Sequence, residues 1–170
     1  MTFDINTLTT KYYNKGVLID ANLLLLLFVG SVSKTLIARC DRTTRYAIED
    51  YDTLIEYLSL FSTRITTPNI MTEVWSLANT SIKGKYKDEF TAVYKNGIQV
   101  LPEHFITSAE ASSHPKFPRI GLSDSVSIIL AKDRWLLLTD DFPLSQYCQS
   151  LGVDCINFNH LRVMNWKIND

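Results

Sequence analysis

Acidic residues stand at several places in this chain where a carboxylate could do chemistry. Asp20 interrupts the apolar run "GVLIDANLLLLLF" (16–28). An ionised carboxylate in such a run is costly unless it is paired or bound to a cation. The other candidates follow or open further apolar segments, and they are Glu73, Asp124 and the adjacent pair Asp140 and Asp141.

Each of these residues also has an ordinary explanation when it is taken alone. Asp124 stands near a predicted helix start, where a carboxylate favours the helix dipole or takes part in a cap. Glu73 is on a predicted amphipathic helix, where most carboxylates are solvated, and the Asp140–Asp141 pair suits a turn or a cap. Asp20 is the hardest to explain in this way, because the sequence names no basic partner for it. The joint placement of the set is what indicates a site.

Segments of strand-like composition alternate with segments of helical spacing along the chain. Five short strands are predicted, at 17–19, 64–67, 98–101, 135–139 and 153–158. Helices are predicted from 22 onward, over 48–61, after Pro68, around 85–95, within 103–112, over 122–132 and over 143–152, with a loop at 114–121. Parallel neighbours need crossover connections, so the alternation predicts an α/β fold with about five strands in a mainly parallel sheet flanked by helices.

The active sites of open parallel sheets lie outside the carboxyl ends of the strands. We therefore expect the acidic residues to meet at one edge of the sheet. Close carboxylates repel by roughly 4 kcal/mol per pair at an effective dielectric constant near 20, so they take up protons or bind a cation. Ligands that are all oxygen favour one or two Mg²⁺ or Mn²⁺ ions over zinc. Such ions activate water and neutralise charge on a phosphate.

Length and composition are those of one folded domain, with 170 residues, 46% hydrophobic and 21% charged. Residues 1–15 are predicted to be an extension, 16–158 the domain, and 159–170 a tail packed on it or trailing it. The net charge of −1 gives no overall basic field, so a nucleic acid would have to bind through local patches. The most basic stretch is 30–47, where the candidate substrate-binding residues are Arg39, Arg42 and Arg45.

Other features narrow the class of protein. Three cysteines with no C-x-x-C pair indicate reduced thiols, and so a cytoplasmic protein without a disulfide framework. The uninterrupted apolar run 23–29 is much shorter than the roughly 20 residues of a membrane span, and no membrane association is expected. The chain has no GxxxxGK, GxGxxG or GxSxG motif, and its histidines show no metal-ligand spacing.

Four segments of the chain, in their order, resemble the acidic motifs of the PIN-domain nucleases. They are "VLIDANLLLLL", "TPNIMTEVWSL", "GLSDSVSIILA" and "LLLTDD". The resemblance spans about 16–158 and implies a single PIN-like domain. In that family a small polar residue follows the first Asp by two positions, here Asn22. The last motif resembles T-x-D, which points to Thr139 and Asp141, with Asp140 as a neighbour that shares or replaces the role.

The resemblance implies a metal-dependent endoribonuclease that uses a metal-activated water and leaves a 5′ phosphate. Asp20, Asp124 and Asp141 would hold Mg²⁺ or Mn²⁺, and Glu73 would complete the cluster and help orient the water. Asn22 and Thr139 would support ligands or substrate. The substrate would be RNA, although the residues do not distinguish RNA from DNA.

The best-populated branch of the family is the toxin half of toxin–antitoxin pairs. The partners that this branch implies are an antitoxin protein and a second copy of the chain in a homodimer. Residues 1–15 and the long basic stretch 30–47 depart from compact toxins.

Two other functions remain open from the sequence. A PIN-like fold can serve as a non-catalytic binding or scaffold module, although such a module has no need of repelling carboxylates. An Asp after the first strand also suits a metal-dependent phosphohydrolase, but enzymes of the haloacid dehalogenase type have a second Asp where this chain has Asn22.

Overall fold

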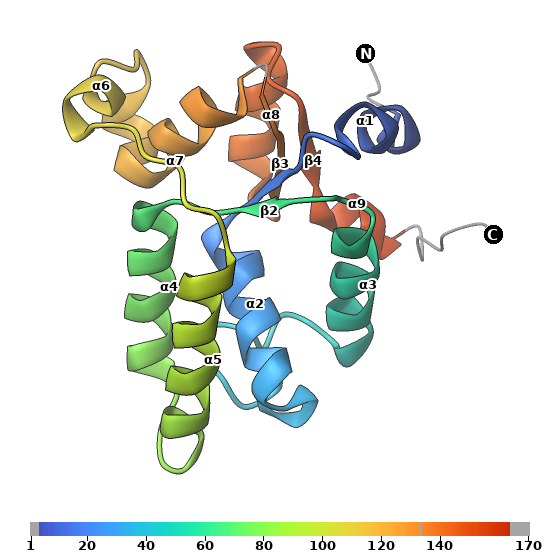
Figure 1. Ribbon diagram of the computed structural model, residues 1–170, viewed down its shortest axis with the longest axis vertical. Helices are drawn as coiled ribbons and strands as arrows, with labels where there is room; N and C mark the ends of the chain where they lie inside the picture. The colour runs from blue at the N-terminus through green and yellow to red at the C-terminus, as the bar shows by residue number, and fades with distance from the viewer. Residues whose placement is uncertain (1–3, 133, 164–170) are drawn as a thin grey trace.

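A computed structural model describes residues 4–132 and 134–163 of the chain (Figure 1). Within them it contains a parallel sheet and the helices around it. In chain order the elements are α1 (Ile5–Tyr12), β1 (Val17–Ile19), α2 (Ala21–Val32), the 3-10 helix η1 (Lys34–Leu36), α3 (Ile48–Ser59), β2 (Arg64–Ile65), α4 (Pro68–Ser81), α5 (Tyr86–Val100), α6 (Ser108–Ser112), α7 (Phe117–Ala131), β3 (Leu136–Thr139), α8 (Phe142–Ser150), β4 (Cys155–Asn157) and α9 (Phe158–Val163).

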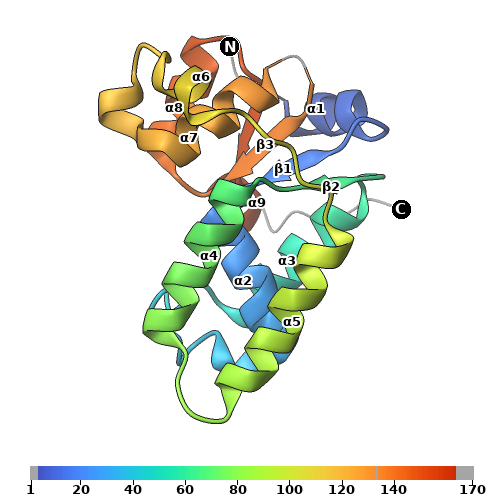
Figure 2. The same cartoon turned by 60° about the vertical axis from the view of Figure 1, so that its left-hand side comes forward.

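The sheet has the strand order β2-β1-β3-β4, and all of its pairs are parallel. Helices α2, α3, α4 and α5 gather on one side of it, while α1, α6, α7 and α8 lie on the other (Figures 1 and 2). Every residue of β1, β3 and β4 is buried. Continuous apolar strands of this kind are typical of parallel sheets that are covered on both faces. The α/β class expected from the sequence is therefore confirmed.

Helix α2 forms the centre of the larger helical layer. It is apolar on nearly all sides and contacts α3, α4 and α5. A helix of this composition is stable in water only when other elements surround it. Gly30 lets α3 approach closely, because a Cβ at this position would lie 2.2 Å from the Tyr51 ring.

The sheet has four strands in the described residues, and the prediction of about five was wrong. The missing strand is 98–101, which belongs instead to the end of α5 and its C-cap at Leu101. The buried residues Phe90, Tyr94 and Gly97 recur at the spacing of one helix face. This continuous face decides the local structure, and the short apolar run at its end does not.

The loop predicted over 114–121 is only partly a loop, because α7 already begins at Phe117. Pro118 stands in the first helical turn, where the missing N–H of a proline does no harm. The helix is interrupted at Gly121, whose φ of 77° and ψ of −171° are far from helical values. The predicted segment 122–132 is thus the second part of one kinked helix.

The first and last described segments are helical and contact the rest of the domain. Asp4 caps α1, and the Tyr12 hydroxyl and the Lys11 ammonium both donate to Asp154 Oδ2, at 2.8 and 2.5 Å. Of the predicted tail, residues 159–163 belong to α9, and 164–170 lie outside the described residues. No helix in the described part of the chain has the length and apolar character needed to cross a membrane.

Candidate active site

The order of the strands reverses at β1. From β1 the chain first adds β2 on one side, and it later returns to add β3 on the other side. At such a reversal the loops that leave the two neighbouring strands diverge, and ligands bind between them. Asp20 follows β1 directly, and Asp140 and Asp141 follow β3. These carboxylates therefore lie at the same edge of the sheet, at the carboxyl ends of β1 and β3.

Asp20 is held by two hydrogen bonds. Its Oδ1 accepts from the backbone N–H of Ala21 at 2.7 Å, which caps α2. Its Oδ2 accepts from the hydroxyl of Thr139 at 2.5 Å. The Thr139 oxygen in turn accepts from the backbone N–H of Asp141 at 3.0 Å. Thr139 is fully buried, and its hydroxyl connects the residues that follow β1 and β3.

Asp124 and Glu73 come to this edge from α7 and α4. Asp124 lies three residues after the kink at Gly121, in the first turn of the second part of α7. Burial, and after it the negative charges of Asp20, Asp141 and Glu73, together raise the pKa of Asp124 from 3.8 to about 7. Asp124 is therefore close enough to Asp20, Glu73 and Asp141 for its charge to interact with theirs.

The pKa of Asp20 is also raised, by burial and by neighbouring charges. Burial is the main cause that raises its pKa to about 6, and the charges of Asp140 and Glu73 act in the same direction. The hydrogen bonds from Thr139 and Ala21 oppose this rise, because they stabilise the ionised form. The pKa of Asp20 stays raised despite the two donors because burial outweighs them, and nearby negative charge adds to its effect.

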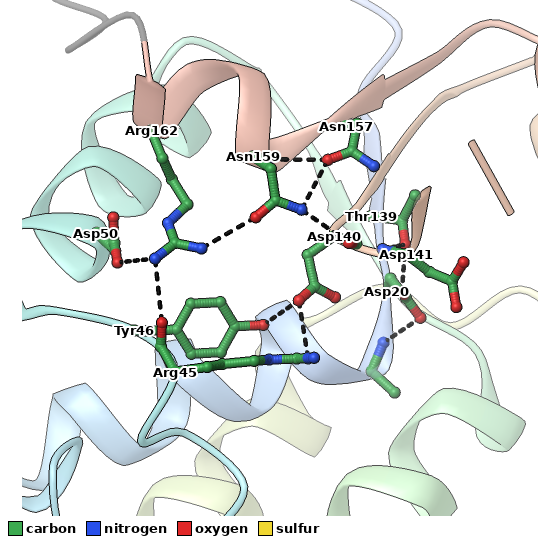
Figure 3. A network of polar contacts seen from close by, with 11 residues as sticks. Asp20, Arg45, Tyr46, Asp50, Thr139, Asp140, Asp141, Asn157, Asn159 and Arg162 are labelled. Carbon is green, nitrogen blue, oxygen red and sulfur yellow. Dashed lines mark hydrogen bonds and ion pairs between the residues drawn. The ribbon is translucent and has the colours of Figure 1, made fainter. Parts of the chain in front are cut away.

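Asp140 and Asp141 point in different directions (Figure 3). Asp141 caps α8, and its Oδ1 accepts from the backbone N–H of Leu144 at 2.8 Å. Asp140 turns toward the basic stretch, where its Oδ2 accepts from the Tyr46 hydroxyl at 2.5 Å and from Arg45 Nη2 at 2.8 Å. The Asp140 side chain is only 4% exposed, and its Oδ1 has no hydrogen-bond partner within the described residues.

A polar network contacts the backbone carbonyl of Asp140 and the neighbouring segments, and no motif in the sequence indicated it. Asn159 donates to the backbone carbonyl of Asp140 at 2.9 Å. Arg162 forms an ion pair with Asp50 at 2.8 Å and donates to the carbonyl of Arg45 at 3.1 Å. The network thus ties α9 and α3 to the segment that carries Arg45 (Figure 3). The contacts of Arg162 join residues more than a hundred positions apart, and no local motif reveals them.

The predicted substrate-binding arginines separate into two groups. Arg45 is engaged with Asp140, and its guanidinium lies 5.0 Å from the centre of the Tyr46 ring. Arg39 and Arg42 are exposed. Asn22 lies in the first turn of α2, two residues beyond Asp20.

A groove of about 460 Å³ opens beside Glu73. Its walls come from the start of α4, from the segment before α6 and from the second part of α7 just before Asp124. Polar side chains of α4 line it together with an exposed aromatic ring, Phe105, which is 69% exposed. The groove is lined in part by Asn69, Thr72, Glu73, Ser76, Phe105 and Ser123.

The donor set at this edge fits a hard divalent cation. Across 4–132 and 134–163, no three His, Cys, Asp or Glu side chains are gathered around one metal position. The carboxylates nevertheless repel one another, and within the same residues Asp20, Glu73, Asp124 and Asp141 form no ion pair. Two buried oxygens without partners, Asp140 Oδ1 and Thr66 Oγ1, belong to residues that follow β3 and β2, the two neighbours of β1. A site of carboxylate oxygens with uncompensated charge suits Mg²⁺ or Mn²⁺.

Comparison with known proteins adds no family to this description. The sequence matches no protein-family model and no curated protein.

Proposed function

We propose that this protein is a metal-dependent nuclease that hydrolyses phosphodiester bonds in RNA and leaves a 5′ phosphate. The observation that supports this most is the meeting of Asp20, Glu73, Asp124 and Asp141 at the carboxyl end of β1. These residues come from four separate segments, and no ion pair within the described residues offsets their charge. The resemblance to PIN-domain nucleases supports the same function.

Asp20, Asp124 and Asp141 would hold Mg²⁺ or Mn²⁺, with Glu73 completing the set. When bound, such an ion lowers the pKa of water and neutralises charge that develops on the phosphate. The protein itself would fix the orientation of the carboxylates that bind the ion. Thr139 fixes the orientation of Asp20, and the cap of α8 fixes Asp141.

Glu73 is the best placed of the four to act on the substrate side. It lines the groove as well as facing the other carboxylates. A carboxylate in this position can accept a proton from an attacking water as that water reaches the phosphate. The groove would then hold the part of the nucleic acid strand that leads to the scissile bond.

The test uses purified wild-type protein and the Asp20→Asn variant with labelled single-stranded RNA and DNA, in Mn²⁺, Mg²⁺ or EDTA. We expect wild type to cleave RNA with either ion and not in EDTA, and Asp20→Asn to lose at least about 100-fold in rate, because a charged ligand is removed. Asp88→Asn is the matched control, since Asp88 is an exposed carboxylate on α5, away from the acidic edge. It should cleave like wild type.

The other outcomes distinguish the competing functions. Full activity of Asp20→Asn would refute its role. Hydrolysis of small phosphate esters without cleavage of oligonucleotides would favour a phosphohydrolase. Absence of both cleavage and Mn²⁺ binding would favour a scaffold module.

A further inference from the structure

In the described residues, one oxygen of the Asp140 carboxylate has hydrogen-bond partners and the other has none. Oδ2 accepts from Tyr46 and Arg45, whereas Oδ1 is buried and has no partner within the described residues. Leaving a buried acceptor unsatisfied costs about 1–3 kcal/mol, and more when it belongs to a charged group. Buried polar atoms without partners are rare in folded proteins, and each calls for a ligand, a water or a functional reason.

The surroundings of Asp140 Oδ1 favour a cation. Asp140 lies close enough to Asp20 for the two charges to interact. In Figure 3 the Asp140 carboxylate lies between Tyr46 and Arg45 on one side and Asp20 on the other. An oxygen that faces a second carboxylate gains most from a positive group placed between the two.

We propose that Asp140 directs Oδ1 to the cation held at the acidic edge, and that Tyr46 and Arg45 are positioning residues that fix its carboxylate through Oδ2. The proposal rests on the proposed function, since it concerns the same cation. It gives the basic stretch 30–47 a role within the site, where the sequence suggested only contact with substrate.

Several contacts hold the Tyr46 side chain in place. The Tyr46 side chain is buried, and guanidinium groups of Arg45 and Arg162 lie 5.0 and 5.5 Å from the centre of its ring. Arg162 is itself held by Asp50 and Asn159. Partners that orient a ligand in this way usually affect metal affinity strongly when they are replaced.

The experiment measures Mn²⁺ affinity without any turnover, from the electron paramagnetic resonance signal of free Mn²⁺. The variants are Asp140→Asn, Asp141→Asn and Tyr46→Phe, and Tyr86→Phe on α5 is the matched control. We expect Asp140→Asn to weaken Mn²⁺ binding about 100-fold and Tyr46→Phe about 10-fold, within the range seen for residues that orient metal ligands. Tyr86→Phe should bind like wild type.

Thermal unfolding in EDTA separates positioning from a merely structural role. A structural role would lower the melting temperature of Tyr46→Phe and leave its Mn²⁺ affinity unchanged, and that result would overturn the proposal. The proposal would also be overturned if Asp140→Asn bound Mn²⁺ with wild-type affinity and only Asp141→Asn bound it more weakly. If the wild-type protein binds no Mn²⁺ at all, the proposed function itself fails, and the two failures are thereby distinguished.

Discussion

The Thr139 hydroxyl lies between two acidic residues that follow different strands. It donates to Asp20 and accepts from the backbone of Asp141, so two carboxylates are fixed by one fully buried side chain. Burial, with neighbouring negative charge, outweighs the hydrogen bonds that stabilise the ionised form of Asp20. Protonation of Asp124 and Asp20 is the response open to the metal-free protein, as their raised pKa values show.

This charge predicts a pH-dependent stability. The folded pKa of Asp124 is about 7 against an ordinary value of 3.8, so between about pH 4 and 7 the folded state binds more protons than the unfolded state. Its contribution to the free energy of unfolding therefore falls as pH rises through that range. In EDTA, Asp124→Asn should exceed wild type in the free energy of unfolding by on the order of 1–3 kcal/mol at pH 8, with little difference at pH 4.

Urea unfolding at the two pH values measures the difference, with Asp88→Asn as the control for removal of an exposed carboxylate. Saturating Mn²⁺ should stabilise wild type at pH 8 and stabilise Asp124→Asn much less, because ligands bind the folded state. An equal gap between wild type and Asp124→Asn at both pH values would contradict the assignment.

The sequence identified most of the acidic residues at this scale and missed how they are oriented. Asp20, Asp124 and Asp141 are found from their places after strands or at helix starts, which is local information. Whether Asp140 or its neighbour turns toward the basic stretch depends on Tyr46, which is 94 positions away. Side-chain direction of this kind follows from tertiary contacts, and no spacing rule contains it.

At the scale of elements, the kink in α7 is what starts a new helical turn just before Asp124. Gly121 has a φ of 77°, a conformation that is strained for any residue with a Cβ. A Cβ there would contact nothing within 4 Å, so backbone strain is the main cost of a substitution. Strain of this kind is relieved when the backbone shifts, and Asp124 would shift with it.

Gly121→Ala should therefore lower both stability, by about 1–3 kcal/mol, and Mn²⁺ affinity. Gly84→Ala provides a close control, because Gly84 also has a positive φ, of 65°, and equally open space around its Cβ position. It should lose stability by a similar amount and keep wild-type Mn²⁺ affinity. Equal Mn²⁺ affinity in the two variants would show that the kink does not position Asp124.

The groove beside Glu73 carries a second prediction at this scale. Phe105 lines the groove and exposes 69% of its surface, so its ring is available to stack on a nucleobase. Base stacking contributes about 1–3 kcal/mol per base, and Phe105→Ala should weaken binding of single-stranded RNA in EDTA about tenfold. Phe105→Trp should restore it, and Ile55→Ala, at an exposed apolar residue of α3, should have no effect.

Fluorescence anisotropy with labelled RNA measures this affinity without cleavage. An RNA with one abasic position opposite the ring should bind Phe105→Ala and wild type alike. A tenfold loss that persists for every single-abasic RNA would mean that Phe105 acts on the fold and does not stack on a base.

Helices with long, regular patterns and two of the short apolar strands were predicted well, whereas one short apolar run was not. The faces of α3 and α4 follow the spacing of their buried residues, and β1 and β3 are where the apolar runs place them. The segment 98–101 has the composition of a strand, yet it ends a helix because the preceding face continues into it. Apolar runs of four residues do not distinguish the two structures.

At the scale of the whole molecule, the strand order decides where the carboxylates meet. A parallel sheet that grows on both sides of β1 leaves one crevice, and the acidic residues of distant segments border it. The net charge of −1 leaves positive charge concentrated locally, at Arg45, which pairs with Asp140, and at the exposed residues Arg39 and Arg42. Strand order was the part of the fold that the sequence left open.

The opposite end of the sheet is where α1 is attached. Lys11 and Tyr12 bind Asp154, which stands just before β4, so this helix and the acidic edge are at different ends of the strands. Cys40, Cys148 and Cys155 are all buried. A cysteine introduced at the exposed Thr10 of α1 would thus be the accessible thiol for a maleimide dye. Single molecules tethered or labelled there would present the acidic edge to the solution.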